Sequence, residues 1–137
     1  MHVWDENVAG RGGDEIGSCI LKYLKTKGIC AKKLVIFSDN CGGQNKNWNI
    51  MAIWSYLIHT KQFEEIEHYF LITGHTYLSS DRYFAKIEKY QRGQPNVYSP
   101  SHWRDIIQSC GRKHKFDVIE MECRDFFWHN SFKKWTH

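Results

Sequence analysis

The chain has 137 residues, of which 42% are hydrophobic and 25% are charged, and its formal net charge is +4. These values indicate a soluble globular domain, and the mild positive charge is compatible with a polyanionic partner without identifying one. The chain has no run of ~18 apolar residues and no secretion signal, and its five cysteines are widely spaced. We therefore expect a nuclear or cytoplasmic protein that is not secreted and does not span a membrane.

Predicted strands and helices alternate along the chain, which is typical of a single α/β domain. In chain order we predict a strand end at residues 3–4, a helix at 15–27, a strand at 34–37, a helix at 48–59, a strand at 66–73, a helix from 81, a helix at 100–110 and a strand at 116–121. Asp14 and Ser99 suit N-cap positions, and Gly28 and Gly111 suit helix ends.

Two apolar runs predict buried elements. Residues 34–37 are all apolar and include β-branched side chains, which is typical of a central strand covered on both faces. Residues 48–59 are apolar over nearly their whole length, so we predict a helix that is largely buried.

Three carboxylates lie near the ends of predicted elements. Asp39 follows the strand at 34–37, Asp81 follows the next strand at the start of a helix, and Glu15 lies in the first turn of the first helix. Ligands and metals gather at the carboxyl ends of parallel strands, and Mg²⁺ or Mn²⁺ prefers carboxylate oxygens. The same residues would also serve as a turn cap, an N-cap and a favourable first-turn charge, so the pattern leaves both readings open.

The order of elements resembles the second half of an RNase H-like fold, a three-layer α/β fold with a mixed central sheet flanked by helices. The sequence is also similar to an uncharacterised eukaryotic family, frequent in arthropods, that includes transposon-derived members. This similarity spans residues 3–126 and is carried by residues 3–6, 11–19, 37–47, 74–76 and 81–82. The resemblance implies that Asp39 and Asp81 are metal ligands, with Glu15 as a third, in a Mg²⁺- or Mn²⁺-dependent nuclease or transposase that acts on DNA.

Further residues near these acids are candidates for supporting roles. The resemblance implies that His75 is a general base that orients water, although a histidine that bonds the neighbouring backbone is the favoured interpretation of this residue. Phosphate and base contacts with DNA are expected from Lys46, Asn40, Gln44, Asn45 and Arg82.

One departure from the RNase H-like pattern bears on activity. That fold takes its first metal-binding aspartate from an opening strand, and we find no segment for this strand before Val3. We therefore predict a partial catalytic core at residues 1–126 and an aromatic and basic tail at 127–137. We expect little or no nuclease activity from this chain alone. The alternative is a non-catalytic domesticated domain that binds nucleic acid or protein.

Two other chemistries fit the sequence less well. Cys110, His114, Cys123 and His129 offer zinc ligands, but they lack the closely spaced pairs of structural zinc sites. Cys41 with His75 offers a nucleophile and a base, but no oxyanion site accompanies them. The oligomeric state cannot be read from the sequence.

Overall fold

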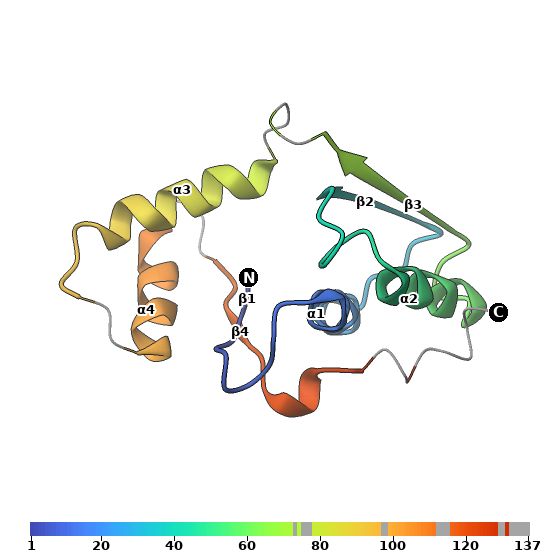
Figure 1. Cartoon of the computed structure of the whole chain (residues 1–137), viewed down its shortest axis with the longest axis horizontal. Helices are drawn as coiled ribbons and strands as arrows, with labels where there is room; N and C mark the ends of the chain where they lie inside the picture. Colours follow the sequence, from blue (N-terminus) through green and yellow to red (C-terminus); the bar gives the residue numbers. More distant parts are fainter. Residues whose placement is uncertain (73, 75–77, 97–98, 112–115, 129–130, 132–137) are drawn as a thin grey trace. The chain divides into compact units, whose positions relative to one another are not determined.

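The computed structural model of the chain describes residues 1–72, 74, 78–96, 99–111, 116–128 and 131, and it confirms the α/β class. In chain order the elements are β1 (His2–Val3), α1 (Gly13–Lys27), β2 (Lys33–Asp39), α2 (Trp48–His59), β3 (Glu65–Leu71), α3 (Ser79–Gln91), α4 (Pro100–Cys110), β4 (Ile119–Glu120) and a short 3₁₀ helix, η1 (Cys123–Asp125) (Figure 1). The chain divides into a first unit, Met1–Val8 with Tyr77–Met121, and a second unit, Ala9–Thr76 with Glu122–His137.

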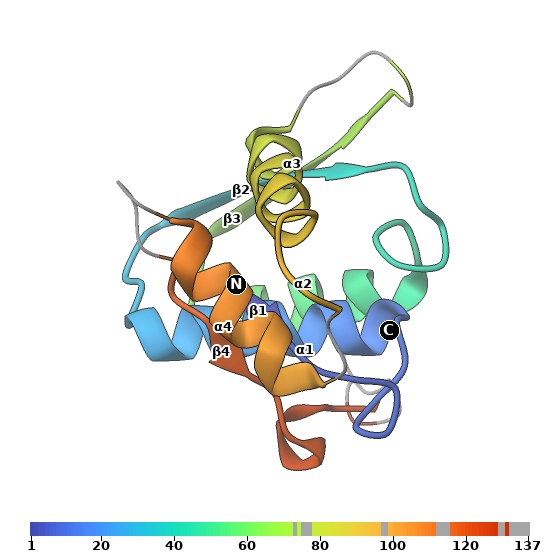
Figure 2. The same cartoon turned by 90° about the vertical axis from the view of Figure 1, so that its left-hand side faces the viewer.

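The second unit is built on the parallel strands β2 and β3. Their register runs from Lys33 opposite Glu65 to Asp39 opposite Leu71. Helices α1 and α2 lie on the same side of the two strands (Figure 2). Among the described residues of this unit, no helix covers the outer face of the strands.

The prediction that residues 34–37 are covered on both faces is wrong. Leu34 and Ile36 point inward and pack against the core, whereas Val35 and Phe37 are 43% and 57% exposed. Phe37 stacks on Tyr69 of β3, with ring centroids 5.2 Å apart. A continuous apolar run does not distinguish a strand covered on both faces from one whose outer residues cover each other.

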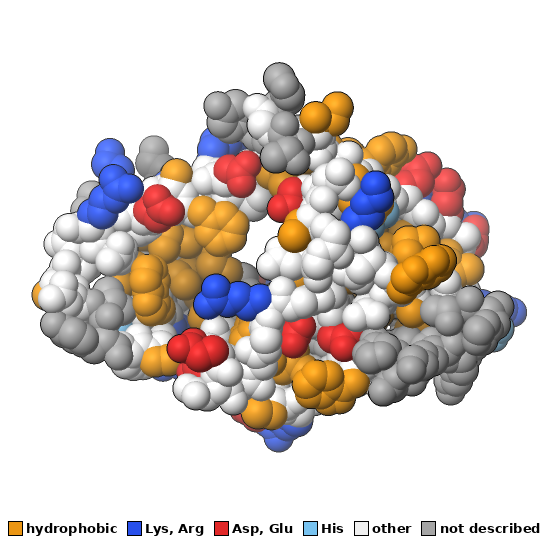
Figure 3. Space-filling view, in the orientation of Figure 1, with side chains coloured by type: hydrophobic (Ala, Val, Ile, Leu, Met, Phe, Trp, Pro, Cys, Tyr) orange, Lys and Arg blue, Asp and Glu red, His pale blue; other side chains and the backbone are white. Residues whose placement is uncertain are grey.

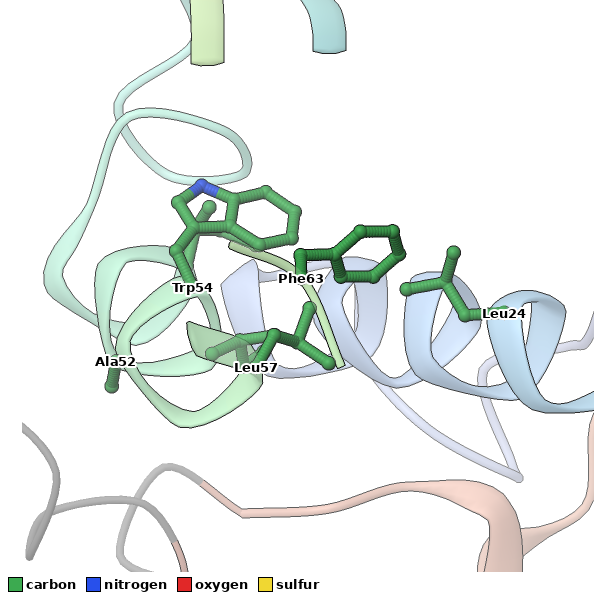
Figure 4. Packing of buried hydrophobic residues seen from close by; sticks show 7 residues of the cluster. Leu24, Ala52, Trp54, Leu57 and Phe63 are labelled. Atoms are coloured by element: carbon green, nitrogen blue, oxygen red, sulfur yellow. The ribbon is translucent and has the colours of Figure 1, made fainter. Parts of the chain in front are cut away.

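The core of the second unit lies between α1, α2 and the inner face of the strands. Leu57 is fully buried, and Figure 4 shows it beside Trp54 and Phe63, with Leu24 of α1 next to them. The helix at residues 48–59 is confirmed with its predicted bounds. However, it is not buried all round, because Trp48, Met51 and Ile58 remain 80%, 48% and 38% exposed.

Glycine allows α1 to approach α2 closely. A Cβ atom on Gly17 would lie 2.0 Å from Cδ1 of Ile53, and one on Gly13 would lie 2.6 Å from the side-chain amide of Asn47. Helix α1 ends as predicted at Gly28, whose φ of 57° is left-handed. The segment after β4 packs on α1, where Ser18 Oγ accepts a hydrogen bond from Phe127 N–H at 2.8 Å.

The first unit joins β1 and β4 in parallel and packs α3 against α4. His2 lies opposite Ile119, and Ile87, Ile106 and Ile107 form the buried cluster. Ser99 caps α4 as predicted, since its Oγ accepts from His102 N–H. The strand predicted at 116–121 is shorter than expected and covers only Ile119–Glu120.

The two strand pairs are both parallel. The mixed central sheet, and the domain boundary after residue 126, stay predictions. Among the described residues, no helix combines the length and hydrophobicity needed to cross a bilayer.

Candidate functional site

The candidate site lies at the carboxyl end of β2 and in the loop at residues 40–47, all within the second unit. Asp39 is the last residue of β2 and is exposed. Its Oδ1 accepts hydrogen bonds from the backbone N–H of Cys41, at 3.3 Å, and from the side-chain amide of Asn45. Its Oδ2 has no partner among the described residues. Asp39 therefore closes its own turn with one oxygen and presents the other to solvent.

The loop is held closed by its own polar groups. The carbonyl of Cys41 accepts from the N–H groups of Gln44, Asn45 and Lys46 at 3.2, 2.8 and 3.0 Å. Asn47 caps α2 by accepting from Ile50 N–H at 3.1 Å. These bonds connect the start of the loop to its end at α2.

The residues that were predicted to contact nucleic acid differ in whether their side chains already make hydrogen bonds within the protein. Gln44 donates its side-chain amide to the carbonyl of Arg11 at 3.2 Å, and the Asn45 amide is bound to Asp39. Asn40 and Lys46 are exposed, and the Lys46 ammonium lies over the Phe70 ring at 5.6 Å from its centroid. Lys46 and Asn40 are therefore the side chains of this loop that can meet a phosphate without breaking a loop bond.

Glu15 bonds the backbone at the start of α1. Its carboxylate is buried, at 8% exposure, and its two oxygens accept from Gly10 N–H at 3.1 Å and Gly12 N–H at 2.8 Å. The second bond caps the start of α1, because the side chain of its third residue accepts from the N–H of the N-cap residue. The sequence left this structural reading open, and the geometry supports it.

Asp81 has a comparable local role in the first unit. It occupies the third position of α3, is exposed, and its Oδ2 accepts from Leu78 N–H at 2.9 Å. Arg82, beside it, is also exposed. Asp39 and Asp81 belong to different units, so their meeting at one cation stays a prediction. His75 lies outside the described residues.

A divalent cation requires several oxygen or nitrogen ligands that converge on one point. Among the described residues, no group of three His, Cys, Asp or Glu side chains could hold a metal ion. In the second unit, Glu15 is turned toward backbone N–H groups and Asp39 offers one uncommitted oxygen. The residues described in either unit do not fit a two-metal site, and no catalytic step is derived through one.

The rival chemistries gain no support. Cys110 is half-buried, and burial raises the pKa of its thiol. Cys110 and Cys123 belong to different units, and His114 and His129 lie outside the described residues, so the zinc hypothesis stays a prediction. The partnership of Cys41 with His75 is likewise untested.

A polar cluster under the candidate site was not predicted. His68 Nε2 lies 2.8 Å from Ser38 Oγ, and the Trp54 indole N–H donates to His68 Nδ1 at 3.2 Å. Because an indole can only donate, Nδ1 must be unprotonated, so Nε2 carries the proton and donates to Ser38. His68 therefore cannot act as a base toward Ser38, and the cluster positions the end of β2. The alternation of Ile66, His68 and Phe70 was the sequence signal for an inward histidine.

Beside this cluster, an open groove of about 910 Å³ runs between α2 and β3. Burial lowers the pKa of His68, which lies in its wall. The lining residues are Met51, Trp54, Ser55, Ile58, His59, Glu64, Glu65, Ile66, His68 and Phe70.

Comparison with known proteins gives a family and no function. No curated protein matches the chain, and no solved structure matches it. A family model described as a domain of unknown function, DUF7869, matches residues 13–135 and so covers α1 through most of the segment after η1. The chain belongs to the DUF7869 family.

Proposed function

We propose that the chain is part of an RNase H-like, metal-dependent nuclease or transposase core of transposon origin that acts on DNA, and that it has little activity by itself. The observation that carries this proposal is the position of Asp39. It ends a parallel strand, is exposed, and keeps one carboxylate oxygen clear of the loop. Active sites of open α/β sheets form at such strand ends.

The composition of the loop supports a polyanionic substrate. Lys46 and Asn40 are exposed near Asp39 in the sequence, and the N–H of Lys46 is bonded to the carbonyl of Cys41. A cation held at Asp39 would lie next to these groups, and together they would bind a phosphate through charge and hydrogen bonding. Such an arrangement provides binding, whereas cleavage requires further carboxylates at the same metal.

The expected lack of activity follows from the donor set. One uncommitted oxygen on Asp39 is a weak ligand for a divalent cation when it acts alone. Mg²⁺ and Mn²⁺ sites usually add substrate oxygens to their one or two carboxylates. We therefore expect millimolar rather than micromolar affinity for Mn²⁺. We expect no cleavage above background.

Paramagnetic broadening by Mn²⁺ tests the assignment of Asp39. In ¹⁵N spectra of the full chain, Mn²⁺ is expected to broaden the amides of residues 40–46 first, and Asp39→Asn is expected to abolish this. The matched control is Asp105→Asn, an exposed aspartate of α4 outside the candidate site. Broadening that is unchanged in Asp39→Asn would refute the proposal.

A second candidate is a non-catalytic domain that binds nucleic acid or protein. The observation that favours it is that Glu15 and Asp81 both accept backbone N–H groups at helix starts, as structural acids do. Fluorescence anisotropy with a labelled single-stranded DNA separates the two. Binding that needs Mg²⁺ and is weakened in Asp39→Asn supports the nuclease lineage. Equal binding in EDTA, weakened only in Lys46→Ala, supports the binding domain.

A further inference from the structure

The groove between α2 and β3 leaves a strand edge and apolar side chains exposed together. Among the described residues, β3 pairs only with β2, so its other edge is open. Met51 and Ile58 of α2 line the groove below that edge and are 48% and 38% exposed. No residue of β2 lines the groove. Exposed hydrophobic side chains are also visible on the face shown in Figure 3. An open edge above an apolar groove is a template for an added strand.

We propose that this groove is occupied by a second copy of the same chain, with the two β3 strands pairing antiparallel about a two-fold axis at His68. A two-fold interface brings the same surface of both copies together, so each residue must suit its own counterpart. The result is a four-stranded sheet whose two α2 helices flank the axis on the inner side.

The sequence of β3 fits this register. His68 is the middle of the seven residues Glu65–Leu71, so an axis there pairs the whole strand with its copy. Ile66 then lies opposite Phe70 on the inner face, and Glu67 lies opposite Tyr69 on the outer face. Opposite side chains in antiparallel strands are close enough to interact directly.

The register centred one residue earlier in β3 is less favourable. Moving the axis to Glu67 places two carboxylates against each other, which is destabilising. With the axis at His68, no acid of β3 opposes another. Glu65 and Glu67 also keep the Lys33 ammonium that each contacts within its own chain, at 3.1 and 2.5 Å.

Charge complementarity supports the same partner. The Lys46 ammonium lies over Phe70, at 5.6 Å from the ring centroid. In the dimer, Phe70 lies opposite Ile66 of the other copy. Glu64 lies two residues before Ile66 in that copy, so it is on the same face of the sheet as Ile66. Lys46 therefore comes beside Glu64 of the other copy. Glu64 is exposed, and its contact with Lys32 in its own chain is 3.4 Å long with both side chains largely in solvent.

Analytical ultracentrifugation of the full chain, without DNA, tests the proposal. We expect a concentration-dependent species with twice the monomer mass of 16.3 kDa. Met51→Lys and Ile58→Lys, which bring a charge into the groove, should each weaken dimerisation by roughly tenfold or more. The matched control on the same helix is Trp48→Lys, which removes an exposed apolar side chain that does not line the groove and should leave dimerisation unchanged.

A charge swap tests the register without touching the core. Lys46→Glu and Glu64→Lys should each weaken the dimer by about fivefold to tenfold, since the two-fold axis repeats the pair and exposed pairs are individually weak. The double variant should restore dimerisation, whereas Lys32→Glu combined with Lys46→Glu should not.

Hydrogen exchange identifies the edge. Amides of β3 should become more protected as protein concentration rises, and those of β2 should not. A chain that stays monomeric at all concentrations, a dimer insensitive to Met51→Lys and Ile58→Lys, or protection confined to β2 would each overturn the proposal.

Discussion

At the scale of single residues, His68 is held neutral by its surroundings. It lies on the inner face of β3, receives the Trp54 indole N–H, and donates to Ser38 Oγ. Burial lowers its pKa below the ordinary value of 6.5. A proton on Nδ1 would remove the acceptor for Trp54, so charging this ring in the folded protein costs a hydrogen bond as well as hydration.

This environment predicts a pH dependence of stability. The unfolded chain takes up a proton on His68 as the pH falls through about 6.5, before the folded protein does. The stability contribution is therefore fully present above 6.5 and decreases as the pH falls toward the lower folded pKa. Urea denaturation at pH 7.5 and pH 5.5 measures it. His68→Gln should show a smaller loss between these pH values than the wild type. An equal loss in both proteins would mean that other groups cause it.

Glu15 offers a test that separates a structural acid from a metal ligand. Its carboxylate satisfies the N–H groups of Gly10 and Gly12 at the start of α1. Glu15→Ala should destabilise the chain by about 1–3 kcal/mol in EDTA, because the cap at the start of α1 is lost together with two partly buried hydrogen bonds to backbone N–H groups.

Glu15→Gln retains one acceptor and should cost less than Glu15→Ala. Chemical denaturation in EDTA provides the measurement, and Asp14→Ala on the same turn is the control for the loss of a first-turn charge. Unchanged stability of Glu15→Ala in EDTA, together with weaker Mn²⁺ binding, would assign the residue to the metal instead.

The positions of the helices and strands could be predicted from local sequence patterns. Which of their faces are buried could not be predicted in this way. The bounds 48–59 of α2 are confirmed, and Ser99 and Gly28 act as the cap residues that their types predict. Which side of β2 is covered depends on the partners of the strand, and a run of four apolar residues carries no information on that.

The close contact of α1 with α2 predicts the effect of a larger side chain at Gly17 on stability. A Cβ atom on Gly17 would lie 2.0 Å from Cδ1 of Ile53, which is itself buried. Gly17→Ala should therefore destabilise by about 1–2 kcal/mol, because overpacking outweighs the gain in helix propensity of roughly 1 kcal/mol.

Shortening the opposing side chain should relieve the clash. Ile53→Val removes Cδ1, so the double variant should be more stable than the sum of the two single effects predicts, as measured in a double-mutant cycle by urea denaturation. Additive effects would mean that α1 moves away from α2 instead. Gly28→Ala is a useful comparison, since nothing lies near its Cβ position and its cost arises from the left-handed φ of 57° alone.

In the molecule as a whole, the position of Asp39 could be predicted from the sequence, but the contacts of the residues around it could not. The sequence placed Asp39 just after a strand at 34–37, and the structure extends that strand so that Asp39 is its last residue. The sequence could not show that Glu15 turns toward Gly10 and Gly12, because that depends on the local backbone path. It also could not show that His68 bonds Ser38 and Trp54, because these contacts join segments that are distant in sequence. The meeting of Asp39 with Asp81 involves two units and stays a prediction.

The two units have separate cores, and this predicts separate responses to core mutations. Leu57 is fully buried in the cluster of the second unit, and Ile107 is 6% exposed in that of the first. Leu57→Ala and Ile107→Ala should each cost about 2–5 kcal/mol, because each removes buried methyl groups and leaves a cavity. If each unit opens cooperatively by itself, each variant should loosen only its own unit.

Native-state hydrogen exchange measures this unit by unit. Leu57→Ala should lower the protection of amides in α1, α2 and β3 and leave α3 and α4 unchanged, and Ile107→Ala should do the reverse. The conservative variants Leu57→Met and Ile107→Val should follow the same division with smaller losses, which distinguishes local loosening from general unfolding. Equal loss of protection in all four helices after either alanine substitution would show that the chain unfolds as one cooperative unit, with 1–126 acting as the single domain that the sequence predicts.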